Sequence, residues 1–290
     1  MTAKPDSDAD PETLRLASSL TECIGRLDSA LVAFSAGVDS TVVAKATCLA
    51  LGDRAAAAIG VSPALPEGEL QAARELTKAI GIRLVEVDTQ EIHDENYLSN
   101  PTNRCFFCKD ELYAQLAQVC EQQSLAAILN GANADDTRDH RPGMRAATEH
   151  KVLSPLIECG IDKAGVRRLA QHWGLPVWDK PASPCLASRV AYGEPITRER
   201  LARIDAAERW IRGQGPREVR VRLHEGEHAR VEVPREWVDE FTSDPLKKQL
   251  TTELHRLGFQ SVEIDPDGFR SGSLNAFVPA EELQSATNAD

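Results

Sequence analysis

The segment at residues 31–40, LVAFSAGVDS, constrains the fold of this chain more than any other. Its four apolar residues, 31–34, have the composition of a buried parallel strand. A loop of small residues follows and leads into a helical pattern from Ser40. A strand that turns through small residues into a helix aims free backbone N–H groups at one point, and the helix dipole adds positive charge there. The segment therefore predicts an anion site.

The side chains of this loop indicate which kind of anion would bind. Ser35 and Ser40 add hydroxyl donors on either side of Gly37. Asp39 is unfavourable beside an anion unless a cation such as Mg²⁺ bridges the two. We therefore expect a nucleotide polyphosphate at Ser35, Gly37, Asp39 and Ser40, with Mg²⁺ on Asp39. An ordinary serine and glycine turn before a helix is the simpler alternative.

Strand and helix patterns alternate along the first two thirds of the chain, which predicts an α/β fold with a doubly wound parallel sheet. The expected strands are 31–34, 55–61, 82–87 and 126–130, and the expected helices are 11–27, 40–50, 69–80, 113–122 and 163–173. Ligands of such sheets bind beyond the carboxyl ends of the strands. The loops that follow the strands should therefore share one crevice, which adds Ser62, Gly131 and Asp135 as nucleotide-site candidates.

The pattern changes near residue 190, which suggests a domain over 1–190 and a smaller α+β domain over 191–290. The expected elements of the second domain are a helix at 194–212, paired strands at 218–223 and 229–233, helices within 235–257 and a hairpin around 265–268.

Composition excludes several classes of partner. The 290 residues carry a net charge of −12, which argues against a broad nucleic-acid surface. No apolar run is long enough to span a bilayer, and the acidic, polar start does not resemble a signal peptide. We expect a cytoplasmic protein that acts on a small molecule and binds neither nucleic acid nor a membrane.

The seven cysteines fall into two groups, and without a signal peptide a disulfide framework is not expected. Four lie in helical or apolar stretches and are expected to be small buried hydrophobes: Cys23, Cys48, Cys120 and Cys159. The other three have cationic neighbours, which favour the thiolate form. Cys105 and Cys108 form a C-x-x-C, which can be redox-active, metal-binding or incidental, and Cys185 follows two prolines that suggest a rigid loop.

Charged residues elsewhere offer further candidates, each with a simpler alternative. The loop at 131–136 could bind a metal or a ribose, or be a solvated turn. Arg138, Arg141 and Arg145 could hold carboxylates or phosphates in fork geometry, or serve solubility.

In the second domain, Glu208 shares a helix stripe with Leu201, Ile204 and Ile211, which suggests an interface or a catalytic role, or only drift near the helix end. Arg220 and Arg222 face one side of a strand and could bind a phosphate or form the wet face of a sheet.

The loop at residues 35–40, SAGVDS, resembles the S-G-G-x-D-S loop of the ATP pyrophosphatase (PP-loop) superfamily, with Ala36 where that family usually has glycine. The methyl group of alanine at this position destabilises the loop more if the φ angle is positive than if it is negative. Most of the chain also resembles the LarE family of ATP-dependent sulfur transferases, which act in the biosynthesis of the nickel-pincer nucleotide of lactate racemase. The matching stretches are FSAGVDS, NPTNRCFFCK, GANADD, RPGMRAA, SPLIE, WDKPASPCLASR, YGEPIT and VRVRLH.

The resemblance implies that ATP with Mg²⁺ adenylates a carboxylate of pyridinium-3,5-biscarboxylic acid mononucleotide and that sulfur displaces AMP. It implies two sulfur sources: Cys185 alone, sacrificed as dehydroalanine, or a [4Fe–4S] cluster on Cys105, Cys108 and Cys185 that carries an extra sulfide. Because all three cysteines are present, the cluster is the expectation. A hexameric assembly through the second domain is also implied. The implied substrate contacts are Arg138, Arg145, Ser188, Arg189, Glu208, Arg220 and Arg222.

Other functions compete with this one. A tRNA thiolase also joins a PP-loop to cysteines but needs a basic face, and an amidotransferase-like ligase needs a glutaminase segment that is not apparent. A nucleotide-binding regulator with a zinc or redox sensor explains the loop but not three thiols with cationic neighbours.

Overall fold

The computed structural model describes residues 10–138, 142–181 and 183–270. The chain forms two compact units. Unit 1 consists of the residues up to Val61, Gly68–Thr89 and Cys105–Ser183, and unit 2 of Ser62–Glu67, Gln90–Arg104 and the residues from Pro184. Two short segments of the N-terminal half therefore belong to unit 2, which a single boundary at residue 190 does not describe. The two-domain division over 1–190 and 191–290 stays a prediction.

Unit 1 is built on a parallel sheet in the order β3-β2-β1-β4. Its strands are β1 (Ala30–Ala33), β2 (Ala55–Val61), β3 (Arg83–Asp88) and β4 (Ala127–Leu129). Ala30 is in register with Ala55 on one side and with Ala127 on the other. Because β1 connects to β2 on one side and pairs with β4 on the other, the sheet has its switch point between β1 and β4, where ligands of such sheets bind.

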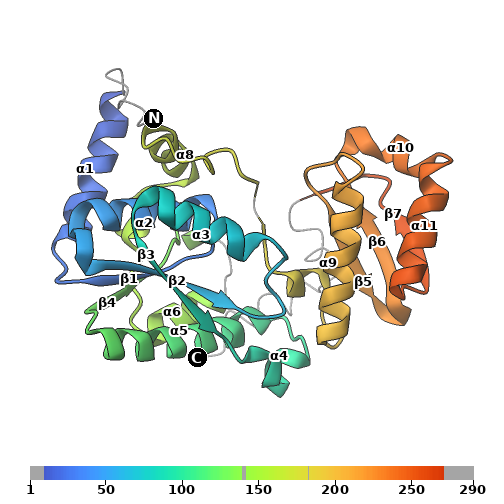
Figure 1. Cartoon of the computed structure of the whole chain (residues 1–290), viewed down its shortest axis with the longest axis horizontal. Coiled ribbons are helices and arrows are strands. Elements are labelled where there is room, and N and C mark those ends of the chain that lie inside the picture. Colours follow the sequence, from blue (N-terminus) through green and yellow to red (C-terminus); the bar gives the residue numbers. More distant parts are fainter. Residues whose placement is uncertain (1–9, 139–141, 182, 271–290) are drawn as a thin grey trace. The chain divides into compact units, whose positions relative to one another are not determined.

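Helices cover both faces of this sheet (Figure 1). One face carries α1 (Pro11–Gly25), α2 (Val38–Leu51), α3 (Glu69–Ile80) and α8 (Lys163–His172), and the other α5 (Arg104–Gln123) and α6 (Pro142–Glu149). The short elements are η1 (Gly52–Arg54), η3 (Ala134–Arg138) and α7 (Pro155–Glu158). Leu31, Leu116 and Ala146 are fully buried in the core between the sheet and α5 and α6. The predicted doubly wound α/β fold is confirmed.

The interior of the sheet explains its strand composition. β2 reads AAAAIGV, and five of its seven residues are buried. Small side chains let α2 and α5 approach the sheet closely. Gly60 also allows a close approach of α5, because a Cβ there would lie 3.1 Å from Leu112 Cδ1. The apolar runs predict strands because both faces of a parallel sheet are covered.

Unit 2 is an α+β unit with a three-stranded sheet in the order β5-β6-β7. β5 (Arg220–His224) and β6 (His228–Glu232) are antiparallel, and β6 and β7 (Ser261–Ile264) are parallel. Its helices are α4 (Glu95–Leu98), α9 (Arg198–Arg212), α10 (Val238–Thr242) and α11 (Leu246–Leu257), with η2 (Glu91–His93), η4 (Leu186–Arg189), η5 (Glu225–Glu227) and η6 (Arg235–Trp237).

Two helix starts differ from the sequence predictions by more than two residues. The helix expected at 113–122 begins at Arg104, so the C-x-x-C lies on its first turns. The helix expected from 194 begins at Arg198, because Thr197 caps it by accepting the N–H of Arg200. Asp265 and Gly268 form the expected turn after β7. The second strand of the predicted hairpin would lie beyond Arg270, outside the described residues, so the hairpin stays a prediction.

Among the residues that the structure describes, no helix is both long and apolar enough to cross a membrane.

Candidate active site

The loop after β1 forms a compact turn at the start of α2. Gly37 occupies the N-cap position without a side-chain cap, which leaves the first N–H groups of the helix for a ligand. Ser40 ties the loop to the helix, because its Oγ accepts the N–H of Ser35 at 3.2 Å and lies 3.1 Å from the Ser35 Oγ. The predicted strand, loop and helix start are therefore present.

Ala36 adopts a left-handed conformation, with φ of 55°. This region disfavours every residue with a Cβ, by roughly 1–2 kcal/mol. The glycine usual in the PP-loop superfamily avoids that strain, so the methyl group of Ala36 is carried at a cost. The side chain of Lys180 contacts this residue, since its Nζ donates to the Ala36 carbonyl at 3.3 Å and to Glu69 Oε2 at 2.8 Å.

Asp39 is held through both of its carboxylate oxygens. Asn133 Nδ2 donates to Oδ1 at 3.0 Å, and the ammonium of Lys163 forms an ion pair with Oδ2. Both partners come from segments that follow β4 in the chain. Sequence reasoning did not select Lys163 or Asn133, although Asn133 lies inside the GANADD stretch.

Gly131 allows the loop after β4 to approach the PP-loop. A Cβ at this position would lie 2.7 Å from the backbone nitrogen of Ser40 and 3.1 Å from the carbonyl carbon of Asp39. Asp135, four residues on, accepts the backbone N–H of Lys163 at 3.0 Å. Gly131 and Asp135 therefore lie at the switch point with Asp39 and Ser40, and their part in nucleotide binding stays a prediction.

Three other candidates of the first half have different surroundings. Ser62 belongs to unit 2, where its Oγ accepts the N–H of Ala64 at 3.2 Å. Arg145 pairs with Glu149 at 2.7 Å and stacks on the Phe106 ring at 4.5 Å. Arg138 ends η3, but its side chain, like all of Arg141, lies outside the described residues.

Cys105 and Cys108 occupy the first turns of α5 and, three residues apart, share one side of it. Cys105 is exposed and Cys108 is half-buried. The start of α6 packs beside them, because a Cβ on Gly143 would lie 3.7 Å from the Cys105 carbonyl oxygen. The pair is therefore accessible on a rigid element.

Arg104, the residue before Cys105, belongs to unit 2 and is buried there. Its guanidinium donates to Asn100 Oδ1 at 2.6 Å and to the Ala187 carbonyl at 2.7 Å. Ala187 lies two residues after Cys185. Arg104 and Ala187 both belong to unit 2, so within that unit the Arg104 side chain is bonded to the loop that carries Cys185.

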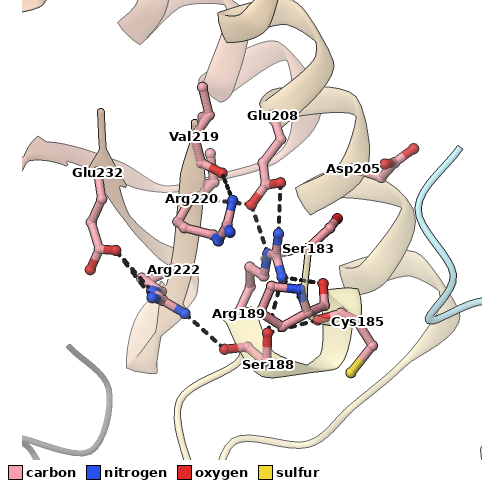
Figure 2. A network of polar contacts seen from close by, with 12 residues as sticks. Ser183, Cys185, Ser188, Arg189, Asp205, Glu208, Val219, Arg220, Arg222 and Glu232 are labelled. Carbon is pink, nitrogen blue, oxygen red and sulfur yellow. Dashed lines mark hydrogen bonds and ion pairs between the residues drawn. The ribbon is translucent and has the colours of Figure 1, made fainter. Parts of the chain in front are cut away.

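Cys185 is the N-cap of η4, and its carbonyl is the centre of a small network (Figure 2). The Ser188 Oγ donates to that carbonyl at 2.7 Å, and Arg189 Nη1 donates to it at 3.1 Å. The sulfur points away from the Arg189 guanidinium. The loop is thus fixed through its backbone while the partly exposed thiol stays outside the network.

Arg189 and Glu208 are both completely buried and form a bidentate ion pair, with Nε to Oε1 at 2.9 Å and Nη2 to Oε2 at 3.2 Å. Glu208 also accepts Arg212 Nη2 at 2.6 Å and the N–H of Val221 at 3.1 Å. The carboxylate on the helix stripe is therefore not drift near a helix end: it joins α9, β5 and the Cys185 loop.

Arg220 and Arg222 extend this cluster along β5 (Figure 2). Arg222 pairs with Glu232 at 3.1 Å and donates to the Ser188 carbonyl at 3.0 Å. Arg220 stacks on the Phe269 ring at 5.1 Å, and burial, with a smaller contribution from Arg189, lowers its pKa to about 10. The five predicted substrate contacts from this half of the chain thus gather around one loop, and their role stays a prediction.

The four cysteines expected to be buried are half-buried instead. Each of them, Cys23, Cys48, Cys120 and Cys159, lies near the C-terminal end of a helix. Burial raises the pKa of Cys120 to about 11. Burial, with Cys159 and Glu158 beside it, raises that of Cys23 to about 12. These two thiols therefore stay protonated at neutral pH and are unsuited to bind a metal, because the thiolate is the form that does so.

Within the described ranges, no group of three or more His, Cys, Asp or Glu side chains is arranged as a metal site. Cys105 and Cys108 belong to unit 1 and Cys185 to unit 2, so the convergence of the three thiols stays a prediction. None of the three is in a disulfide, which leaves cysteine sulfurs of the type that hold iron–sulfur clusters. At the PP-loop, the single carboxylate of Asp39 suits Mg²⁺, which usually takes one or two carboxylates together with substrate phosphates.

Known proteins resemble this chain at the level of sequence. A family model described as NAD synthase matches residues 15–115. A Synechocystis protein described as uncharacterized is 44% identical over 257 residues, covering 89% of this chain and 96% of the relative. The pyridinium-3,5-bisthiocarboxylic acid mononucleotide synthase of Lactiplantibacillus plantarum is 33% identical over 267 residues, covering 92% of this chain and 96% of the relative.

The parallel sheet and the loop at the start of α2 define an ATP-using enzyme of the PP-loop class. Within that class the chain belongs to the LarE family, because it is similar to the Lactiplantibacillus synthase over nearly its whole length.

Proposed function

We propose that this chain converts pyridinium-3,5-biscarboxylic acid mononucleotide to the bisthiocarboxylic acid mononucleotide with ATP. The observation that carries the proposal is the PP-loop site at the sheet switch point, in a chain that is 33% identical over 92% of its length to a synthase of the thio product. A carboxylate is a poor electrophile, and transfer of AMP to it creates a good leaving group for sulfur.

The PP-loop supplies what adenylation needs. The N–H groups at the start of α2, with the Ser35 and Ser40 hydroxyls, suit the phosphates of ATP. Asp39 would hold Mg²⁺, whose charge would stabilise the departing pyrophosphate. Gly131 and Asp135 border the same site, and Ser62 remains a candidate for the nucleotide from unit 2.

The sulfur source is proposed to be a [4Fe–4S] cluster held by Cys105, Cys108 and Cys185. When bound, the cluster would supply an extra sulfide for transfer. The exposed position of Cys105 and the partly exposed position of Cys185 support this set, because both sulfurs are accessible. Sacrifice of the Cys185 sulfur is the alternative.

The cationic cluster of unit 2 is proposed to position the substrate. Arg220 and Arg222 carry the charge that suits its phosphate, and Arg189 with Ser188 would orient the Cys185 loop. Arg138 and Arg145 remain candidates for its carboxylates. Assembly as a hexamer through unit 2, service to a lactate racemase and a cytoplasmic location are part of the same proposal.

The function is tested with protein purified without oxygen. ATP, Mg²⁺, the biscarboxylate mononucleotide and sulfide are mixed, and AMP, pyrophosphate and the thio product are followed by mass spectrometry. AMP and pyrophosphate formed in equal amounts, with two of each for every molecule of bisthio product, support the proposal, because each of the two carboxylates is adenylated once. Hydrolysis of ATP that does not depend on this substrate, or a shift of bulk tRNA in a gel, would favour the thiolase alternative.

Two measurements decide the sulfur source. Iron and sulfide counted in the oxygen-free protein should approach one [4Fe–4S] cluster per chain, and less than about one iron per chain contradicts it. The mass of the chain after turnover should be unchanged. A loss of one sulfur and two hydrogens at Cys185 would instead show the sacrificial route.

A further inference from the structure

Asp39 has no unoccupied carboxylate oxygen. Oδ1 accepts from the Asn133 amide at 3.0 Å, and Oδ2 is ion-paired with Lys163. The Asp39 side chain is 23% exposed and that of Lys163 40% exposed, so solvent reaches the pair without separating it. A cation that binds Oδ2 therefore competes with the ammonium of Lys163, because two positive charges on one oxygen repel each other.

The backbone of Lys163 is fixed, while its side chain is not. Lys163 is the first residue of α8, and its N–H donates to Asp135 Oδ2 at 3.0 Å. Asp162 caps the same helix by accepting the Gly165 N–H at 2.7 Å. These bonds hold the first turn of α8 against the loop after β4. Only the flexible four-carbon stem of the lysine is free to redirect the charge.

The neighbourhood of Asp39 requires a counter-charge. Asp39 is in the first turn of α2, beside the N–H groups that suit phosphate. An uncompensated carboxylate at that position would repel the same phosphates. An ammonium and a divalent cation can each neutralise it, but the two would repel each other if both lay on Oδ2.

We propose that Lys163 is a placeholder for the divalent cation on Asp39. It neutralises the carboxylate until a metal–nucleotide complex arrives, then yields Oδ2 to the metal and carries its ammonium to a phosphate oxygen. The inference rests on the proposed binding of ATP at this loop. It assigns to Lys163 a positioning role that acts through Asp39.

The two halves of this role have opposite consequences when the charge is removed. Without Lys163, Asp39 attracts a free divalent cation more strongly, because its competitor is gone. A metal–nucleotide complex, by contrast, binds less tightly, because a phosphate contact is lost. A lysine that only stabilises the loop would weaken both kinds of binding when replaced.

The test uses the full chain without nucleotide and Mn²⁺ as the probe, with free Mn²⁺ followed by electron paramagnetic resonance. Lys163→Met should bind Mn²⁺ roughly fivefold more tightly than the unchanged protein, and Lys163→Arg should not differ from it. In calorimetry, Lys163→Met should bind α,β-methylene-ATP with Mg²⁺ at least about tenfold more weakly. Lys78→Met, at the exposed end of α3, is the matched control and should change neither affinity.

A second variant locates the effect. In Asp39→Asn combined with Lys163→Met, the tighter Mn²⁺ binding should disappear. Equal Mn²⁺ affinity in Lys163→Met and the unchanged protein overturns the proposal, as does tighter binding that survives Asp39→Asn. If Lys163→Met fails to fold by circular dichroism, Lys163→Gln takes its place. Since the Mn²⁺ titration needs no turnover, a lack of AMP formation by the unchanged protein would reject the proposed reaction and leave this result standing.

Discussion

Arg189 and Glu208, nineteen residues apart, form a bidentate ion pair in which neither side chain is exposed to solvent. Arg189 also donates to the carbonyls of Pro184 and Cys185. The pair therefore connects the helix α9 to the backbone of the loop that carries the proposed sulfur ligand.

Replacing Glu208 with alanine should destabilise the protein by roughly 3–5 kcal/mol, because a buried guanidinium would lose its partner. Arg212→Ala is the control: Arg212 binds the same carboxylate but its side chain is 34% exposed, so its loss should cost less than about 1 kcal/mol. Urea denaturation followed by circular dichroism measures both. If both variants lowered the free energy of unfolding equally, the buried pair would contribute no more to stability than the partly exposed one.

Asn100→Ala should also destabilise unit 2, by about 2 kcal/mol or more. The side-chain amide of Asn100 donates to the carbonyls of Ala191 and Glu194 and accepts from Arg104. Its φ of 54° adds to the cost, since asparagine tolerates this region better than alanine does. Asn96→Ala, on the exposed side of α4, should have a small effect in the same denaturation experiment.

Gly131→Ala should abolish binding of a fluorescent ATP analogue. The new methyl group would meet the Ser40 nitrogen at 2.7 Å, and backbone on both sides cannot give way without opening the PP-loop. Gly25→Ala, at the end of α1 with no atom within 4 Å of the new Cβ, is the control and should bind the analogue normally. Retained binding in Gly131→Ala would contradict the close approach of the two loops.

The thiols should differ in their reaction with iodoacetamide at pH 7.5. Cys105 is exposed, whereas burial raises the pKa of Cys120 to about 11 and, with Cys159 nearby, that of Cys23 to about 12. Since the thiolate is the reacting form, the cluster-free chain should be labelled at Cys105 well before those two. Peptide mapping by mass spectrometry gives the order of labelling. Labelling of Cys120 before Cys105 would contradict the prediction.

Stability should fall below about pH 6.5 in part because of His224. Burial lowers the pKa of this residue, with His228, Arg230 and Arg222 adding to the effect. The unfolded chain therefore binds the proton first, so the contribution is complete above the unfolded pKa and is lost as the pH falls through the folded one. His224→Gln should reduce the difference between urea midpoints at pH 7.5 and pH 5.5, and an unchanged difference would assign the acid sensitivity to other groups.

Much of the fold follows from local patterns. The strand at 55–61 and the helix at 69–80 have the predicted bounds, and Gly81 ends that helix in the left-handed conformation expected of a cap. The C-x-x-C on a helix was missed, because residues 104–112 mix polar and aromatic side chains without a clear apolar stripe. The turn at 265–268 is present as predicted, because Asp, Pro and Gly favour turns locally, and the partner strand of that hairpin lies outside the described residues.

By itself, the sequence determined the doubly wound sheet and the strand, loop and helix start at α2, because periodicity, small residues and a strand-to-helix turn act over a few neighbouring residues. Only the tertiary structure decided that Lys163 and Asn133 hold Asp39 and that Glu208 holds Arg189. Such pairs join segments up to 124 residues apart. Which charges meet depends on how the helices pack on the sheet, and no local pattern encodes that packing.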